Sequence, residues 1–214
     1  MSVAAVVVAA GRGVRFGGLK QFATLDGQTV TARSVAAARS VAERVILVVP
    51  EDYIGDGEGA DVIVVGGASR ADSVRSGLRE CAEDDIIVVH DAARPLASPA
   101  LFSSVVRAVV DGADAAVPGL AITDTVKRIE HRDGVTLVRE TIPRDELVTV
   151  QTPQAFRRAS LAKAHERLGD ATDDAGLVEA VGGRVVVVVG EPHNLKITEP
   201  EDLLRVAEHV EVGR

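Results

Sequence analysis

The sequence predicts an α/β fold, a doubly wound and mostly parallel sheet covered by helices, with a β arm that protrudes from it. Short valine runs alternate along the chain with alanine-rich segments of helical pattern, which is typical of strands and helices in succession. With four Phe, one Tyr and no Trp, the core has to be built from small aliphatic side chains. We expect one domain over residues 1–214, because this length is sufficient for a single sizeable core.

The first half of the chain predicts strands that end at Gly, Pro or polar residues and are followed by helices. The expected strands are residues 4–9, 44–50, 62–65 and 86–89, and the expected helices are residues 29–40, 69–80 and 101–110. The first strand is a continuous apolar run, which favours a strand buried in a parallel sheet. Residues 53–60 form a polar connection that is too short to link two domains.

The pattern changes between residues 123 and 151. Polar and apolar residues alternate here around Asp133-Gly134, a strong predictor of a hairpin turn. An exposed hairpin with two polar faces needs support. That support can come from a partner subunit or from the hairpin's own domain, and the residues favour neither. A homodimer joined through the arm is therefore one hypothesis.

The last third returns to α/β pattern. We expect strands or short β segments at residues 115–117, 147–150 and 184–189, and helices at residues 156–168, 173–180 and 199–210. The RVVVVV run at residues 184–189 predicts a fully buried strand. For the final helix, Thr198 is the expected N-cap and Pro200 the first helical residue.

Composition excludes several classes of protein. The net charge of −8 argues against general nucleic-acid binding, which needs a basic face. The single Cys81 provides neither a disulfide framework nor a metal cluster, and we interpret it as a packing residue. No run approaches the roughly 18 apolar residues of a membrane span. The apolar start lacks a charged leader, so we expect no signal peptide and a cytoplasmic protein.

A glycine-rich loop at residues 11–18 follows the first strand. Glycines allow a backbone to approach a ligand with its N–H groups exposed, as phosphate binding requires. Arg12, Arg15 and Lys20 lie in or beside this loop, and no acidic residue occurs before Asp26. A solvated surface turn is the alternative, but three basic residues in an acid-poor window favour a loop that holds a triphosphate.

Two common phosphate-binding motifs do not fit this loop. A Walker A loop requires Gly-Lys-Ser/Thr, but Leu19 follows Gly18. The dinucleotide fingerprint requires a third glycine where Phe16 stands, and an acidic residue about 20 positions on, for which only Glu43 is available. An NAD(P)-binding protein is therefore disfavoured.

Polar residues follow other predicted strands, and the carboxyl ends of parallel strands are where ligands bind. Asp91 leaves a buried strand, and its carboxylate suits Mg²⁺, although it could instead cap the next turn. Arg94 offers a planar fork for a phosphate. Because neighbours on a strand point to opposite faces, His90 and Asp91 do not form a hydrolase-type dyad.

Two further segments reach the same edge of the predicted sheet. Arg70 and Ser73 follow a Gly66-Gly67 turn at a helix start, where amides and a hydroxyl suit the base or ribose of a nucleotide. The alternative for Ser73 is helix capping. Lys196 stands in an apolar stretch, where it either meets a phosphate or extends to solvent.

These residues lie in segments that resemble the 2-C-methyl-D-erythritol 4-phosphate cytidylyltransferase family. The segments are AAGRGVRFGGLKQF, GGASRADSV, HDAARP, DTVKR, QTPQAF, TDDAG and HNLKIT, in this order over about residues 4–204. HDAARP together with QTPQ is quite specific, whereas the glycine loop is shared by many nucleotidyltransferases. The resemblance implies a Rossmann-like nucleotidyltransferase that converts CTP and methylerythritol phosphate to CDP-methylerythritol and pyrophosphate in the non-mevalonate isoprenoid pathway.

The resemblance also implies a role for each matching position. Arg15 and Lys20 match the catalytic cations, and Asp91 matches the Mg²⁺ ligand. The nucleotide-binding set comprises Ala10, Gly11, Gly13, Gly67, Arg70 and Ser73. The residues that match contacts to the sugar phosphate are Arg94, Thr125, Arg144 and Lys196, with Arg144 supplied by the dimer mate. This last match favours an arm exchanged between two subunits.

Two departures from the family pattern and two alternative functions accompany this interpretation. Leu19 stands where the family often has Pro before the loop lysine, and the segment between Gly13 and Lys20 is short. The nearest alternative is a cytidylyltransferase for another polyol phosphate, such as ribitol 5-phosphate. From a different class, the chain could be a non-catalytic nucleotide-binding module.

Overall fold

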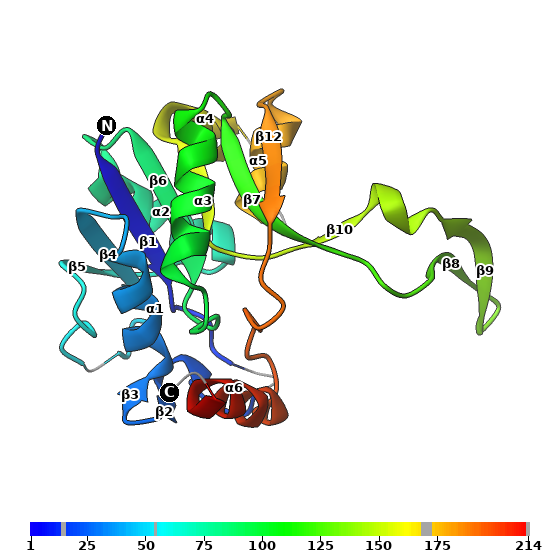
Figure 1. Cartoon of the computed structure of the whole chain (residues 1–214), viewed down its shortest axis with the longest axis horizontal. Coiled ribbons are helices and arrows are strands. Elements are labelled where there is room, and N and C mark those ends of the chain that lie inside the picture. Colours follow the sequence, from blue (N-terminus) through cyan, green and yellow to red (C-terminus); the bar gives the residue numbers. More distant parts are fainter. Residues whose placement is uncertain (14–15, 54, 168–172, 213–214) are drawn as a thin grey trace.

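The computed structural model describes residues 1–13, 16–53, 55–167 and 173–212 (Figure 1). Within this part of the chain, eight strands form one sheet in the order β12-β7-β11-β6-β1-β4-β5, with β10 beside β7 on the β11 side. These strands are β1 (Val3–Val8), β4 (Arg44–Val49), β5 (Val62–Val65), β6 (Ile86–Asp91), β7 (Ala115–Ala121), β10 (Val148–Val150), β11 (Gln154–Arg157) and β12 (Val185–Val189). Only β10 and β11 run antiparallel to their neighbours, so the predicted mostly parallel α/β fold is confirmed.

Helices cover both faces of this sheet. They are α1 (Val30–Ala38), α2 (Arg70–Leu78), α3 (Pro99–Val110), α4 (Arg158–Arg167), α5 (Asp174–Ala180) and α6 (Pro200–Val212). Short elements complete the described part: β2 (Thr24–Leu25), β3 (Gln28–Thr29), β8 (Val126–Arg132), β9 (Val135–Ile142) and the 3-10 turns η1 (Lys20–Phe22), η2 (Arg79–Cys81) and η3 (Arg144–Glu146).

Alternation along the central strands divides the core into two layers. In β1, Ala5 and Val7 face α1 and α3, where they join the layer that contains Phe102. Ala4 and Val6 face the opposite side, with α2, α4 and α5. Because successive side chains of a strand point to opposite faces, a fully buried strand has to be apolar throughout. Cys81 is buried in the second layer, as its predicted packing role requires, and burial raises the pKa of its thiol to about 12.

Helix α6 lies apart from the two layers and closes the lower end of the molecule in Figure 1. It contributes Val206 to a small third cluster with Leu25, Val30 and Ile197. The backbone N–H of Ile197 donates to the carbonyl oxygen of Ala93 at 2.8 Å. This end of the molecule therefore holds the segment before α6 close to the carboxyl end of β6.

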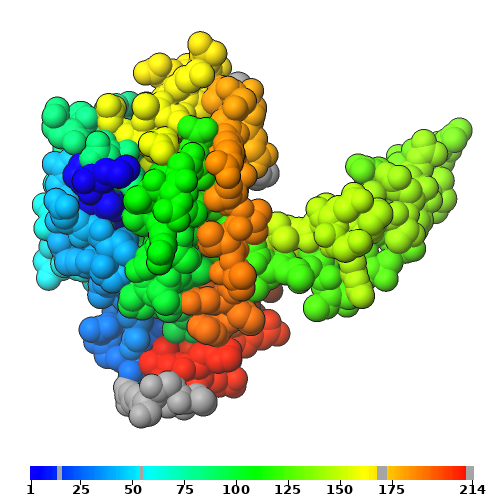
Figure 2. Space-filling model, turned by 45° about the horizontal axis from the view of Figure 1, so that its top comes forward, coloured from blue at the N-terminus to red at the C-terminus, as the bar shows by residue number. Residues whose placement is uncertain are grey.

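The arm extends away from the domain, as Figures 1 and 2 show. Strands β8 and β9 pair antiparallel with each other in a sheet of their own. Asp133 and Gly134 both have positive φ, at 51° and 76°, the conformation of a type I′ hairpin turn. The predicted hairpin is confirmed, and the alternative in which it folds back onto its own domain is wrong.

Two predictions about the sheet are wrong in one respect each: where the helix after residue 155 begins, and how deeply the last strand is buried. Residues 156–168 were expected to be helical, but Phe156 lies in β11, where it pairs with β6 and β7 and is fully buried, and α4 begins at Arg158. Position 168 lies outside the described residues. The strand at residues 184–189 was expected to be fully buried, but β12 pairs only with β7, and Val187 and Val189 are 55% and 87% exposed. A valine run fixes the strand conformation but not its place in the sheet.

One expected helix cap is also wrong. Pro200 is the first residue of α6, as predicted, so Glu199 stands in the N-cap position, and the hydroxyl of Thr198 donates to the carbonyl oxygen of Lys196 at 3.2 Å. Asp202, in the first turn, instead accepts hydrogen bonds from the backbone N–H groups of Thr198 and Glu199 at 2.9 and 3.0 Å. No helix of the described residues is long and apolar enough to cross a bilayer.

Gly77 of α2 lies against the central strand β1, which yields a stability prediction. A Cβ at this position would stand 2.4 Å from Cγ1 of Val6. Alanine gains about 1 kcal/mol of helix propensity over glycine, but overpacking typically costs about 1–3 kcal/mol. We expect Gly77→Ala to lower the free energy of unfolding by about 1 kcal/mol net in urea denaturation. Ser76→Ala, one residue earlier on α2, is the control, and a more stable Gly77→Ala protein would contradict this packing.

Candidate active site

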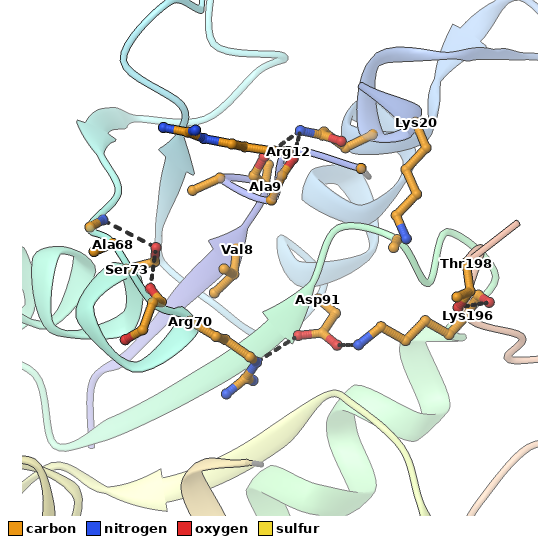
Figure 3. A pocket seen from close by; sticks show the side chains of 17 residues that line it. Val8, Ala9, Arg12, Lys20, Ala68, Arg70, Ser73, Asp91, Lys196 and Thr198 are labelled. Atoms are coloured by element: carbon orange, nitrogen blue, oxygen red, sulfur yellow. Dashed lines mark hydrogen bonds and ion pairs between the residues drawn. The ribbon is translucent and has the colours of Figure 1, made fainter. Parts of the chain in front are cut away.

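A pocket of about 710 Å³ opens at the carboxyl ends of β1 and β6, the edge of a parallel sheet where ligands bind (Figure 3). Four segments far apart in the sequence form its wall. They are residues 8–13 with Lys20 and Gln21, residues 67–70 with Ser73, Asp91 with Ala93, and Lys196 with Thr198. The predicted convergence of these strand ends is therefore confirmed.

The glycine loop is shaped by backbone constraints and by one buried side chain. Gly13 has a φ of 60°, and a Cβ there would lie 1.8 Å from the carbonyl oxygen of Gly18, so only glycine fits. Gln21 is 3% exposed, and its Nε2 donates to the carbonyl oxygens of Ala9 and Gly11 at 2.7 and 2.8 Å. Gln21 thereby ties the end of β1 to η1, where Lys20 begins the turn and extends into the pocket (Figure 3).

The start of α2 forms the opposite wall. Ser69 caps the helix and forms a reciprocal capping box with Asp72. Ser73 is buried, and its hydroxyl accepts from the N–H of Gly67 at 3.2 Å and donates to the carbonyl oxygen of Ser69 at 3.0 Å. The hydroxyl of Ser73 thus fixes the Gly67 turn beside the pocket. The N-cap of α2 is Ser69 and not Ser73.

A row of alternating charges crosses the floor of the pocket. The carboxylate of Asp91 meets Nζ of Lys196 at 2.6 Å and Nε of Arg70 at 3.2 Å (Figure 3). Nη1 of Arg70 donates to Asp174 at 2.7 Å, and Asp174 in turn meets Nε2 of His165 at 3.0 Å. We call Lys196, Asp91, Arg70 and Asp174 the charge row, and the imidazole of His165 lies at its buried end.

Burial and charge oppose each other in this row. Burial alone would raise the pKa of Asp91, but the charges of Arg70 and Lys196 outweigh it and hold this pKa far below its usual range. Burial would lower the pKa of Arg70, yet the carboxylates of Asp91 and Asp174 raise it above its ordinary value. Asp91 is therefore ionised and Arg70 protonated throughout the neutral range.

A second, smaller pocket of about 220 Å³ adjoins the first. Arg70, Asp91 and Lys196 line both pockets. The further lining residues of the smaller pocket are Arg94, Val150, Gln151, Thr152, Gln154 and Asp173. Among the described residues, Nη2 of Arg70 and Nε of Arg94 are buried without a hydrogen-bond partner, which favours an anion in their neighbourhood. The site can thus hold two anionic groups, one on each side of Asp91.

The residues present fit a magnesium ion in part. Asp91 is an ionised carboxylate, the hard oxygen ligand that Mg²⁺ prefers. The part of the chain that the structure describes holds no group of three or more His, Cys, Asp or Glu side chains arranged for a metal. Since Mg²⁺ is commonly bound by one or two carboxylates together with substrate phosphates and water, a single Asp91 is compatible with a metal that arrives with a nucleotide.

Comparison with known proteins decides the family. The family model described as "IspD: 2-C-methyl-D-erythritol 4-phosphate cytidylyltransferase" matches residues 3–211. The chain belongs to the 2-C-methyl-D-erythritol 4-phosphate cytidylyltransferase family. It is 42% identical to the family member of Rhodococcus jostii, over 99% of this chain and 96% of that protein. It is 46% identical to a bifunctional enzyme IspD/IspF of an Anaeromyxobacter strain, of which it spans only 56%.

Solved structures of the family agree with this assignment. The 2-C-methyl-D-erythritol 4-phosphate cytidylyltransferase from Thermus thermophilus aligns with a TM-score of 0.82 and 34% identity, over 99% of this chain and all of that one. The corresponding synthase from Anaerococcus prevotii aligns with a TM-score of 0.80 and 27% identity, over 98% of both chains. The resemblance found in the sequence motifs is thereby confirmed for nearly the whole chain.

The structure places most of the residues predicted from the cytidylyltransferase motifs around the two pockets. Those that line the larger pocket are Ala10, Gly11, Gly13, Lys20, Gly67, Arg70, Ser73, Asp91 and Lys196, and Arg94 lines the smaller one. Thr125 and Arg144 are exposed on the arm and line neither pocket. Arg15 lies outside the described residues. Arg70 was predicted to bind nucleotide, and its guanidinium forms ion pairs with Asp91 and Asp174.

Sequence reasoning missed the residues behind this surface. Gln21, Asp174 and His165 are all buried, and the sequence does not show which groups they hydrogen-bond. Both Gln21 and Asp174 lie inside motifs shared with the family, AAGRGVRFGGLKQF and TDDAG. Their position inside a family motif was the one feature of the sequence that could have identified them, but the sequence did not show which groups they hydrogen-bond.

The charge row yields a stability prediction. Asp174→Asn removes a negative charge from a side chain that is 1% exposed and leaves Arg70 with one carboxylate. Removing one partner of a buried ion pair typically costs about 3 kcal/mol, so we expect a loss of this size in the free energy of unfolding at pH 7. Urea denaturation measures it. Glu179→Gln, an exposed change on the same helix, is the control and should stay within about 0.5 kcal/mol.

Proposed function

We propose that this chain joins CTP to 2-C-methyl-D-erythritol 4-phosphate, releasing pyrophosphate and forming CDP-methylerythritol for isoprenoid precursor synthesis. The observation that carries this proposal is the pair of pockets that share Asp91, Arg70 and Lys196. A nucleotide in the larger pocket and a sugar phosphate in the smaller one would meet across these residues. Membership of the cytidylyltransferase family names the two substrates.

The reaction is an in-line displacement at the α-phosphorus of CTP. A phosphate oxygen of the sugar phosphate forms the new P–O bond, and the bond from the α-phosphorus to the oxygen that bridges to the β-phosphate breaks. The bonding electron pair leaves with pyrophosphate. No covalent enzyme intermediate is needed, so positioning and charge stabilisation provide the catalysis.

Two anions have to approach each other, and the cations of the site reduce their repulsion. Lys20 extends into the larger pocket, and Arg15 is the second cation that the family motif assigns to the triphosphate. Both would stabilise the charge that builds up on the leaving pyrophosphate. Mg²⁺, held by Asp91, would add positive charge at the phosphates when bound.

The arm provides the remaining contacts in this proposal. Thr125 and Arg144 lie on the arm, away from the pockets of their own chain. Apolar side chains are exposed along the arm, with Leu137 at 42% and Val138 at 61%, which favours a partner surface. We therefore propose a homodimer in the cytoplasm in which each arm brings Arg144 to the sugar phosphate in the site of the other subunit.

The catalytic role of Lys20 is tested by Lys20→Ala. Loss of one preorganised charge donor typically lowers turnover about 100- to 1000-fold, while the affinity for CTP should change far less. Pyrophosphate release measures turnover, and isothermal titration calorimetry measures CTP binding. Lys163→Ala, an exposed change on α4, is the matched control. A Lys20→Ala enzyme with normal turnover would contradict the mechanism.

The exchanged arm is tested by mixing variants. Arg144→Ala alone should raise the KM for the sugar phosphate about tenfold or more, because a charged contact is lost, while Arg132→Ala at the hairpin tip should not. When Lys20→Ala and Arg144→Ala subunits are co-refolded in equal amounts, half of the dimers carry one intact site. At a sugar phosphate concentration well below the wild-type KM, where both single variants are slow, activity should then return to about a quarter of the wild-type value, by the symmetry of a dimer. No recovery above the single variants would contradict an arm shared between subunits.

A further inference from the structure

Four residues, two in the wall of the smaller pocket and two buried behind it, form a closed circuit of hydrogen bonds. Thr152 Oγ1 lies 3.2 Å from Nδ1 of His90, and Nε2 of His90 lies 3.2 Å from the carbonyl oxygen of Arg94. Nη1 of Arg94 donates to the carbonyl oxygen of Asn194 at 2.8 Å. Nδ2 of Asn194 donates to the carbonyl oxygen of Thr152 at 2.9 Å, which closes the circuit.

We call His90, Arg94, Thr152 and Asn194 the hydrogen-bond ring. Its members come from the three motifs HDAARP, QTPQAF and HNLKIT, which are separated by up to 104 residues when Asn194 is compared with His90. His90 and Asn194 are fully buried, and Thr152 is 5% exposed. Of these four residues, only Arg94 was predicted to contact a substrate, and it lines the smaller pocket with Thr152.

The ring holds the imidazole of His90 through both of its nitrogens. The hydroxyl oxygen of Thr152 accepts from the backbone N–H of Asp91 at 3.0 Å and lies 3.2 Å from Nδ1 of His90. Nε2 faces the carbonyl oxygen of Arg94, which only accepts, and so Nε2 carries a hydrogen. The two contacts fix the plane of the imidazole between Thr152 and Arg94.

The ring surrounds the turn from which Asp91 and Arg94 reach the substrates. It holds the backbone of Asp91 through Thr152 and the backbone of Arg94 through His90. It also joins the guanidinium of Arg94 to the segment that leads to Lys196. His90 itself packs on Phe102, with ring centroids 5.0 Å apart, on the face of the sheet away from the pocket.

We propose that His90 and Thr152 are positioning residues, which set the Asp91–Arg94 turn, and with it the carboxylate and the guanidinium, for the two phosphates of the reaction. This role rests on the proposed function. Outer hydrogen-bond partners of a functional group typically contribute 10- to 100-fold to activity, because a misplacement of about 1 Å is enough to slow a reaction. The ring is therefore a catalytic support rather than only part of the core.

The test compares two substitutions at one position. Thr152→Val keeps the shape but removes the hydroxyl, which leaves both the N–H of Asp91 and Nδ1 of His90 without a partner, whereas Thr152→Ser retains the hydroxyl. We expect Thr152→Val to lower kcat/KM for the sugar phosphate about 10- to 100-fold, and Thr152→Ser to retain most of it. Thr24→Val, an exposed threonine on β2, is the control.

Folding has to be separated from positioning in this test. Activity is measured at a temperature at which circular dichroism shows each variant fully folded, and CTP binding is measured without metal by calorimetry. Because the ring lies on the sugar-phosphate side, CTP affinity should stay within about threefold of wild type, about 0.7 kcal/mol or less. A loss of activity that only follows the unfolded fraction would overturn the positioning role. A Thr152→Val enzyme with wild-type kcat/KM, or an equally impaired Thr152→Ser enzyme, would overturn it as well.

A spectroscopic measurement tests the ring without turnover. In the wild-type protein labelled with ¹⁵N-histidine, His90, assigned by comparison with His90→Gln, should give the signature of an imidazole with a hydrogen on Nε2. An imidazole without a hydrogen on Nε2 would overturn the inference. Absence of wild-type turnover with CTP and the sugar phosphate would instead overturn the proposed function, so the two failures are distinguishable.

Discussion

Asp91 carries a negative charge at the end of a strand whose six residues are all buried. An ionised carboxylate in such surroundings is stable only when cations and hydrogen-bond donors surround it. Arg70 comes from the start of α2 and Lys196 from the segment before α6, so two distant parts of the chain must converge on one carboxylate. The need to neutralise the Asp91 carboxylate therefore links strand β6, the wall of the larger pocket and the segment that leads into α6.

The same ion pairs explain why the site is poised for anions. Lys196 and Arg70 balance the charge of Asp91, and Asp174 balances Arg70 on its buried side. A phosphate that enters either pocket offers these cations a second acceptor without bringing them from solvent. Because the donors are already in place, little reorganisation is needed when charge develops in the reaction.

The central sheet is packed on both faces, whereas the arm has little support in a single chain. Strands β8 and β9 pair only with each other among the described residues, and two-stranded hairpins are marginally stable in water. Apolar side chains that remain exposed on the arm also favour a surface that covers them. A fold that keeps such an arm needs a surface to receive it, and the proposed second subunit provides one.

The sequence by itself determined the fold class, the succession of strands and helices, the Asp133-Gly134 turn and the family, because these depend on local pattern and on motif order. It also identified Lys20, Asp91 and Lys196 as members of one site, since parallel strands end at one edge of a sheet. Only the tertiary structure decided that Phe156 lies in a strand, that β12 is an edge, that Arg70 pairs with Asp174 and that His90 meets Thr152. These features depend on which distant segments become neighbours in space, and neither a run of valines nor a polar residue in a motif specifies its partner.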